Sequence, residues 1–289
     1  MGKISSRYHV VGSDKKITRR QRILTPFMWI LAIIWMIPVI GALLASFRTN
    51  DSLIMRGFWV IPKHLILANY VQAWTEGQMS QFVVNSFIIT IPAVLGTIFL
   101  STMSAYALNR FHFRLSKAVY YLFVAGVLVP FQVMAIPVFR LTNSLHVYNS
   151  YIGLIIFHMS FNISFGTFVL RNFMKSVPKS IFDSAVMDGA KEWKIFLDLV
   201  IPIMVPAFAA LAILDFTWIF NDYFWALVLV RETSLMPVTT GLKTLFGNYT
   251  TNWAVVMAGS FWAVLPTLLM FLFLQKYFVA GLTLGSTKG

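Results

Sequence analysis

Two acids and two tryptophans recur at helical spacing inside one long apolar stretch of the chain. Asp215, Trp218, Asp222 and Trp225 are three, four and three residues apart, which places all four on one face of an α-helix. A carboxylate beside indole rings suits a sugar, because the acid accepts hydroxyl hydrogen bonds and the ring covers the apolar face of a pyranose. Asn221 adds an amide donor and acceptor. The spacing is compatible with a carbohydrate path. Interhelical hydrogen bonds or capping of a helix by Asp222 and Asn221 are an interpretation of at least equal weight, and the two tryptophans also fit an aromatic belt at the membrane surface.

A second set of polar side chains lies in other apolar stretches. His158 and Asn162 are four residues apart and share a helical face, whereas Gln132 and Asn85 occur singly. One histidine with one asparagine lacks the ligand set of a metal site, so no metal is expected. Interhelical hydrogen bonding is the favoured interpretation of these residues, and lining of a substrate path is the alternative.

The sequence contains no arrangement typical of an enzyme. No nucleophile–base spacing appears, and neither a G-x-x-x-x-G-K-[ST] motif nor another phosphate-cradling loop is present. The two acids have no base beside them in the same stretch that would indicate a proton relay. We therefore expect a non-catalytic chain without a cofactor of its own.

The composition indicates an integral membrane protein. Hydrophobic residues make up 58% of the 289 residues and charged residues only 11%, with a mean hydropathy of +0.75. A soluble protein has about 25% charged residues, so this chain could not cover a water-facing surface. The net charge of +13 is divided into short runs between apolar stretches, without a nucleic-acid motif, so nucleic acid is not an expected partner.

Six apolar stretches are long enough to cross a bilayer core, which takes about 20 residues. They cover residues 25–47, 82–107, 116–139, 151–169, 201–230 and 255–278. Most of the 23 lysines and arginines lie before the first stretch, between the second and third, between the fourth and fifth, and after the sixth. Cytoplasmic segments of membrane proteins are enriched in these residues. We expect an all-α bundle of six transmembrane helices with both termini and the loop 172–202 in the cytoplasm.

The loop between the fourth and fifth stretches has the pattern of two short helices. Ser180 followed by Asp183 has the form of a helix N-cap with an acid in the first turn. Gly189 is expected to end this helix, because glycine adopts the left-handed conformation without steric cost. A second short helix is predicted from the helical spacing of Trp193, Phe196, Leu197 and Val200. From the pattern alone, an amphipathic connector resting on lipid headgroups is one interpretation.

The residues of this loop resemble the EAA motif of ABC importer permeases, E-A-A-x3-G-x9-I-x-L-P. Residues 183–185, Gly189, Leu199, Ile201 and Pro202 match its spacing, with Asp for Glu, Ser for Ala, Leu for Ile and Ile for Leu. In that family the motif forms coupling helices that dock into the ATPase subunits. The resemblance implies that the ATPase-docking residues here are Asp183, Ser184, Ala185, Val186, Met187, Asp188, Gly189 and Ala190.

Other segments resemble the carbohydrate-uptake members of the same family. Residues 104–107 with Arg110 and Phe111 are similar to the pattern S/A-A-Y-A-x-x-R-F, and residues 277–289 resemble the ending of the maltose-type "G" permease. The resemblance covers roughly residues 25–289. It implies that the C-terminal tail is a second ATPase contact, through Lys288 and Gly289.

The resemblance implies a bacterial inner-membrane protein that forms half of a translocation pathway and couples ATPase motion to alternating access. The implied partners are a second permease in a heterodimer, two ATPase subunits that bind Mg-ATP, and an extracytoplasmic solute-binding protein. The expected organisation is a basic cytoplasmic segment 1–24, a transmembrane domain 25–280 and a cytoplasmic tail 281–289.

Two other classes of membrane protein are the alternatives. One is a secondary carrier, driven by protons or sodium through Asp215 and Asp222, and the other is an anchor without a transport role. Within ABC importers, a non-sugar solute such as a glycerophosphodiester is the alternative substrate.

Overall fold

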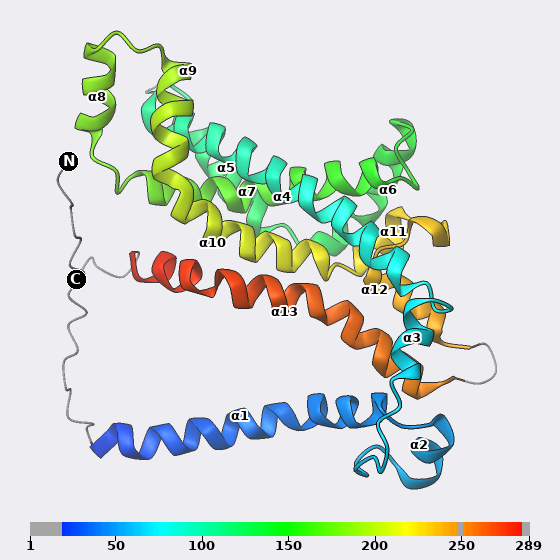
Figure 1. Ribbon diagram of the computed structural model, residues 1–289. Coiled ribbons are helices and arrows are strands. Elements are labelled where there is room, and N and C mark those ends of the chain that lie inside the picture. Colours follow the sequence, from blue (N-terminus) through cyan, green and yellow to red (C-terminus); the bar gives the residue numbers. More distant parts are fainter. Residues whose placement is uncertain (1–18, 112, 248–250, 285–289) are drawn as a thin grey trace, which may run out of the picture.

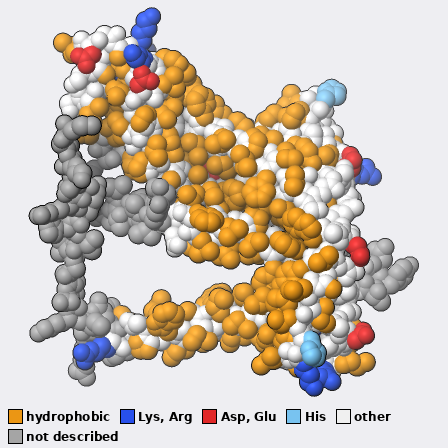
Figure 2. All heavy atoms as spheres, viewed as in Figure 1, with side chains coloured by type: hydrophobic (Ala, Val, Ile, Leu, Met, Phe, Trp, Pro, Cys, Tyr) orange, Lys and Arg blue, Asp and Glu red, His pale blue; other side chains and the backbone are white. Residues whose placement is uncertain are grey.

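The computed structural model describes residues 19–111, 113–247 and 251–284, and within these residues the regular structure is entirely helical. Five helices are long and apolar enough to cross a membrane, and a bent pair of helices raises this number to six if the pair counts as one span. Hydrophobic side chains cover most of the face shown in Figure 2, and charged side chains lie mainly toward its edges. The predicted all-helical membrane architecture is therefore confirmed.

The long helices run across the molecule and the short ones gather at its ends (Figure 1). The long helices are α1 (Arg19–Ser46), α4 (Met79–Arg110), α7 (Tyr151–Met174), α10 (Ile201–Phe220) and α13 (Trp253–Leu284). The shorter elements are α2 (Asn50–Arg56), α3 (Ala68–Trp74), α5 (Ser116–Leu128), η1 (Phe131–Met134), α6 (Ala135–Ser144), α8 (Lys179–Met187), α9 (Glu192–Ile195), η2 (Phe196–Val200), α11 (Phe224–Leu229), η3 (Thr233–Leu235), α12 (Val238–Gly241) and η4 (Leu242–Leu245).

The third predicted span is not one straight helix. α5 and the segment Phe131–Ser144 meet at an angle of 96°, so residues 116–139 do not continue in one direction. Pro130 lies at the break. Proline has no N–H for the helical ladder and disfavours helical geometry in the residue before it, here Val129, which is extended.

The fifth predicted span begins earlier and ends earlier than expected. α9, η2 and α10 form one continuous helix, Glu192–Phe220. The predicted helix through Trp193, Phe196 and Val200 is therefore present, but it is the start of this long helix and not a separate short one. η2 is a π-helical turn immediately before Pro202. Because Pro202 and Pro206 have no N–H to donate, the helix there is free to depart from α geometry.

At its other end α10 stops at Phe220, and residues 221–223 separate it from α11. Asp222 and Trp225 therefore do not share a helix with Asp215 and Trp218. The predicted single helical face of four residues is wrong.

The core of the bundle is built around α4, which packs along α7 and also contacts α10 and α13. Gly166 of α7 lies so close to α4 that a Cβ at this position would clash with Ser101. Small residues allow such close backbone approach between membrane helices. α1 is separated from this core over most of its length and meets it near the N-terminal part of α13 (Figure 1).

Candidate functional site

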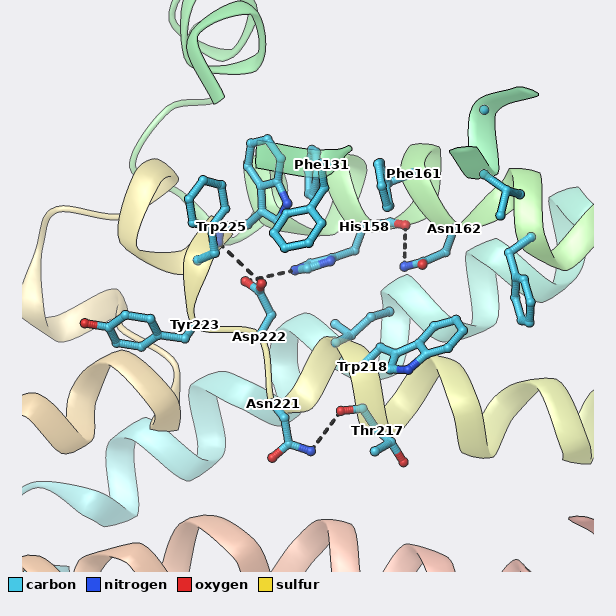
Figure 3. A pocket seen from close by; sticks show the side chains of 16 residues that line it. Phe131, His158, Phe161, Asn162, Thr217, Trp218, Asn221, Asp222, Tyr223 and Trp225 are labelled. Carbon is cyan, nitrogen blue, oxygen red and sulfur yellow. Dashed lines mark hydrogen bonds and ion pairs between the residues drawn. The ribbon is translucent and has the colours of Figure 1, made fainter. Parts of the chain in front are cut away.

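A cavity of about 670 Å³ lies between α5, α7, α10 and the start of α11 (Figure 3). Its lining is mostly aromatic, with a few polar side chains at one side. The lining residues are Gly126, Val127, Phe131, Phe157, His158, Phe161, Asn162, Phe165, Thr217, Trp218, Ile219, Asn221, Asp222, Tyr223, Phe224 and Trp225. A mainly apolar cavity with a small number of oriented polar groups is typical of a small-molecule site.

Asp222 connects two walls of this cavity. Its carboxylate accepts hydrogen bonds from the backbone N–H groups of Trp225, at 3.3 Å, and Ala226, at 3.0 Å, and so caps the start of α11. The same carboxylate lies 3.8 Å from Nε2 of His158 on α7. The hydroxyl of Thr239 donates to the Asp222 carbonyl at 2.5 Å. These contacts fix Asp222 in place, so it both shapes the cavity and lines it.

The other polar side chains of the cavity keep hydrogen-bonding capacity. Asn162 donates its Nδ2 to the His158 carbonyl at 3.0 Å, and Asn221 donates its Nδ2 to the Thr217 carbonyl at 2.8 Å. The Asn221 Nδ2 also donates to the hydroxyl of Thr267 at 3.3 Å. Both amides act only as donors in these bonds, which leaves each amide oxygen able to accept from a bound molecule. Trp218 packs its ring against Phe165, with 5.0 Å between ring centroids, and remains 48% exposed.

The cavity brings together most of the predicted substrate-path residues from separate elements. His158 and Asn162 come from α7, Trp218 from α10, and Asn221, Asp222 and Trp225 from the break and from α11. The aromatic walls, including Phe131, Phe157 and Phe161, were missed by sequence reasoning. Among the 27 phenylalanines of the chain, nothing local distinguishes these from ordinary packing residues.

Three of the predicted substrate-path residues lie outside the cavity. Asp215 is fully buried in α10, and its two carboxylate oxygens have no hydrogen-bond partner among the described residues. Asn85 is buried in α4, donates to the carbonyls of Ser234 and Met236, and accepts from the Tyr151 hydroxyl. Gln132 is exposed in η1, at the bend after α5.

The predicted docking segment forms a helix and a turn at one end of the molecule, where α8 projects beyond the long helices (Figure 1). Pro178 occupies the N-cap position, so the predicted cap at Ser180 is wrong, since Ser180 lies inside the helix. Gly189 has a φ of 79°, and the Ala190 N–H bonds the Ala185 carbonyl at 3.0 Å. The prediction that Gly189 ends this helix in the left-handed conformation is therefore confirmed.

One face of α8 is buried and the other is free. Phe182 is 5% exposed and joins a cluster with residues of α4, α7 and α10. Val186 and Met187 are exposed, Met187 at 87%. Of the docking candidates in residues 183–190, all are exposed except Ala185 and Ala190, which are half-buried against the cluster around Phe182. Lys288 and Gly289 lie outside the described residues.

Residues 19–111, 113–247 and 251–284 contain no group of three or more His, Cys, Asp or Glu side chains that could hold a metal ion.

Comparison with known proteins agrees with this arrangement. The chain is 32% identical to the osmoprotective compounds uptake permease protein GgtD of Synechocystis sp., over 89% of each chain. It is 33% identical to the arabinooligosaccharides transport system permease protein AraQ of Bacillus subtilis, over 92% of this chain and 95% of that protein. In structure it is similar to a chain of a bacterial ABC transporter involved in the import of the acidic polysaccharide alginate, with a TM-score of 0.79, 22% identity, and coverage of 90% and 98%.

Residues 97–283 match the family model of the binding-protein-dependent transport system inner membrane component. The match covers more than half of the chain and includes the α8 turn and the residues that line the cavity. The chain therefore belongs to the family of binding-protein-dependent transport system inner membrane components, the permeases of ABC importers.

Proposed function

We propose that this chain is the membrane-spanning permease subunit of a bacterial ATP-driven carbohydrate importer. The observation that carries the proposal is similarity over nearly the whole chain to permeases named for saccharides. Besides AraQ, these are the melibiose/raffinose/stachyose import permease MelC of Bacillus subtilis and a probable permease for starch degradation products of Thermoanaerobacterium thermosulfurigenes.

The cavity supports an uncharged substrate. Aromatic side chains and amides form its lining, and none of the lining residues is a lysine or arginine. An anionic solute such as a glycerophosphodiester would meet Asp222 there without a cation to balance its charge. We therefore favour a neutral carbohydrate over an anionic solute as the substrate. We assign the substrate path to His158, Asn162, Trp218, Asn221 and the residues around Asp222.

In the proposed topology the bent pair of α5 and residues 131–144 counts as one span, which gives six spans. Both termini and residues 172–202 then lie in the cytoplasm of a bacterium, with segments 1–24 and 281–289 flanking the domain 25–280. The excess of lysine and arginine in these segments supports this orientation.

The exposed surface of residues 183–190 is the proposed docking site for an ATPase subunit. Since the sequence has no phosphate-cradling motif, Mg-ATP is assigned to two partner ATPases, and this subunit is not catalytic. Binding of ATP would move α8 and switch the spans between inward and outward access. Such a switch requires that the ATPases contact α8 differently in the two states.

Two further partners complete the proposed importer. A second permease supplies the other half of the pathway, because six spans alone enclose only a small space. A solute-binding protein delivers the sugar to the outer loops, within 48–80 and 231–252. A similar fold, with a TM-score of 0.63 and 18% identity, occurs in the bacterial alginate ABC transporter in complex with alginate pentasaccharide-bound periplasmic protein.

Uptake by vesicles tests the proposal. The complex is reconstituted with its ATPases, given binding protein with a radiolabelled oligosaccharide, and loaded with ATP inside or left without it. We expect uptake only with ATP, and unchanged uptake when an ionophore collapses ion gradients. Uptake that follows the ion gradient without ATP would indicate the secondary carrier, and ATP hydrolysis that no solute stimulates would indicate the anchor.

A further inference from the structure

Arg110, the last residue of α4, bridges the two acidic side chains nearest to it on the neighbouring short helices. Its Nη1 donates to Oδ1 of Asp183 on α8 at 2.9 Å, and its Nε donates to Oε1 of Glu192 on α9 at 3.4 Å. Tyr106, one turn earlier on α4, donates its hydroxyl to the other oxygen of Glu192 at 2.5 Å. We call Tyr106, Arg110, Asp183 and Glu192 the Arg110 cluster.

The Arg110 cluster lies over a buried aromatic contact between the same elements. The ring centroid of Tyr106 is 6.4 Å from that of Phe182 on α8 and 5.6 Å from that of Phe196 in η2. Both phenylalanines are nearly fully buried. The end of α4 is therefore joined to α8 and to the α9–α10 helix in two ways, by the buried packing of aromatic rings and by the charged hydrogen bonds of the Arg110 cluster.

The exposure of the acids indicates what the charged contacts contribute. The side chain of Asp183 is 65% exposed and that of Glu192 is 42% exposed, whereas that of Arg110 is only 22% exposed. Exposed ion pairs contribute little to stability. A guanidinium, however, has several donors in a rigid plane, so it fixes the direction of each carboxylate relative to α4. Orientation of α8 and α9 is thus the main effect of Arg110.

We propose that Arg110 is a positioning residue that transmits movement of α8 to α4 and to the α9–α10 helix together. The proposal rests on the proposed function, since that function assigns ATPase docking to α8. Besides the packing of Phe182, α8 is connected to its neighbours along the chain through the turns at 175–178 and 188–191. The contacts of Arg110 with Asp183 and Glu192 would pass a displacement of α8 to α4 and to the start of the α9–α10 helix at the same time. Without these contacts, the displacement would be taken up by bending of the two turns.

The first test compares Arg110→Gln and Arg110→Lys with Arg114→Gln in reconstituted vesicles. Arg114 is exposed in the turn just after α4, so Arg114→Gln is a matched control that removes one positive charge from the same region. Uptake and ATP hydrolysis are measured in the same vesicles. For Arg110→Gln we expect sugar transported per ATP to fall about two- to thirtyfold, the range for a residue that carries coupling, with unchanged co-purification of the ATPase. Lysine keeps the charge but not the planar fork, so Arg110→Lys should restore only part of the loss.

A second test reads the geometry without transport. The chain has no cysteine, so spin labels at Ser180→Cys on α8 and Leu115→Cys beyond α4 report the distance between these elements in the purified complex. Arg110→Gln should broaden this distance distribution, and Arg114→Gln should not. An unchanged ratio of transport to ATP hydrolysis, an unchanged distance distribution, or loss of ATPase binding would each overturn the proposal. If the wild-type complex shows no ATP-dependent uptake, the proposed function fails, and the distance measurement still decides whether Arg110 orients α8.

Discussion

Replacement of Gly189 tests whether the left-handed turn after α8 is what the ATPase recognises. Gly189 has a φ of 79°, and a Cβ at this position would meet no atom within 4 Å. The cost of Gly189→Ala is therefore conformational rather than steric, about 1–2 kcal/mol for an L-residue in this region. If docking requires the turn, the affinity of the ATPase should fall about five- to thirtyfold, since 1.4 kcal/mol is tenfold. Gly189→Asn should cost less, because Asn adopts this conformation more readily.

The assay is titration of the ATPase subunit against the permease in lipid nanodiscs, with Kd as the readout. Gly57→Ala is the matched control, because Gly57 ends α2 with a φ of 74° and also has open space around its Cβ position. Its ψ of 175° lies in a region essentially limited to glycine, so alanine is strained there as well. Gly57 lies beyond the far end of α1, where no ATPase contact is proposed, and Gly57→Ala should leave Kd unchanged. Equal affinities for wild type, Gly189→Ala and Gly189→Asn would refute the role of the turn.

Three further predictions concern the cavity and the core. Trp218→Ala should raise the KM of uptake about fivefold, the effect of losing about 1 kcal/mol of ring contact, whereas Leu227→Ala, an exposed side chain of α11 outside the cavity, should not. Asp222→Ala removes the cap of α11 and should lower the free energy of unfolding by about 0.5–2 kcal/mol. Asp222→Asn can still cap the helix and should retain most of this stability, so equal losses for the two variants would exclude capping as the cause. Asn85→Leu removes the donor to the Met236 carbonyl and the acceptor of the Tyr151 hydroxyl, whereas the Ser234 carbonyl still accepts from Gln81. This change should lower the free energy of unfolding of the complex by about 1–3 kcal/mol, read as a lower thermal midpoint, without changing KM.

The sequence predicted those features that depend on neighbours along the chain. Apolar length identified the spans, and a glycine after a short amphipathic segment identified the end of α8. The cap at Ser180 failed because Pro178, which cannot continue a helix on its N-terminal side, sets the start two residues earlier. Each of these correct and incorrect predictions depends on residues that are close together in the sequence.

Features that depend on distant residues could not be predicted. Residues 221–223 contain neither proline nor glycine, and Asn221 at the C-cap is the one local residue typical of a helix end. The helical spacing continues from Asp215 to Asp222 across this end, so the spacing alone predicted an unbroken helix. The partner of Asp183 is Arg110, 73 positions away. The cavity walls come from five separate elements, α5, η1, α7, α10 and α11, which only packing brings together.

The close contact of α4 with α7 at Gly166 has a consequence for distances across the membrane. Two helices without room to slide past each other tilt as one body. α4 has 32 residues, Pro92 among them, which at 1.5 Å per residue is about 48 Å of helix. A tilt of only about 10° imposed at the Arg110 end would move the Met79 end by about 8 Å over this length. α4 and α7 together thus have the dimensions of a lever, in which small movements at one face of the membrane become large ones at the other.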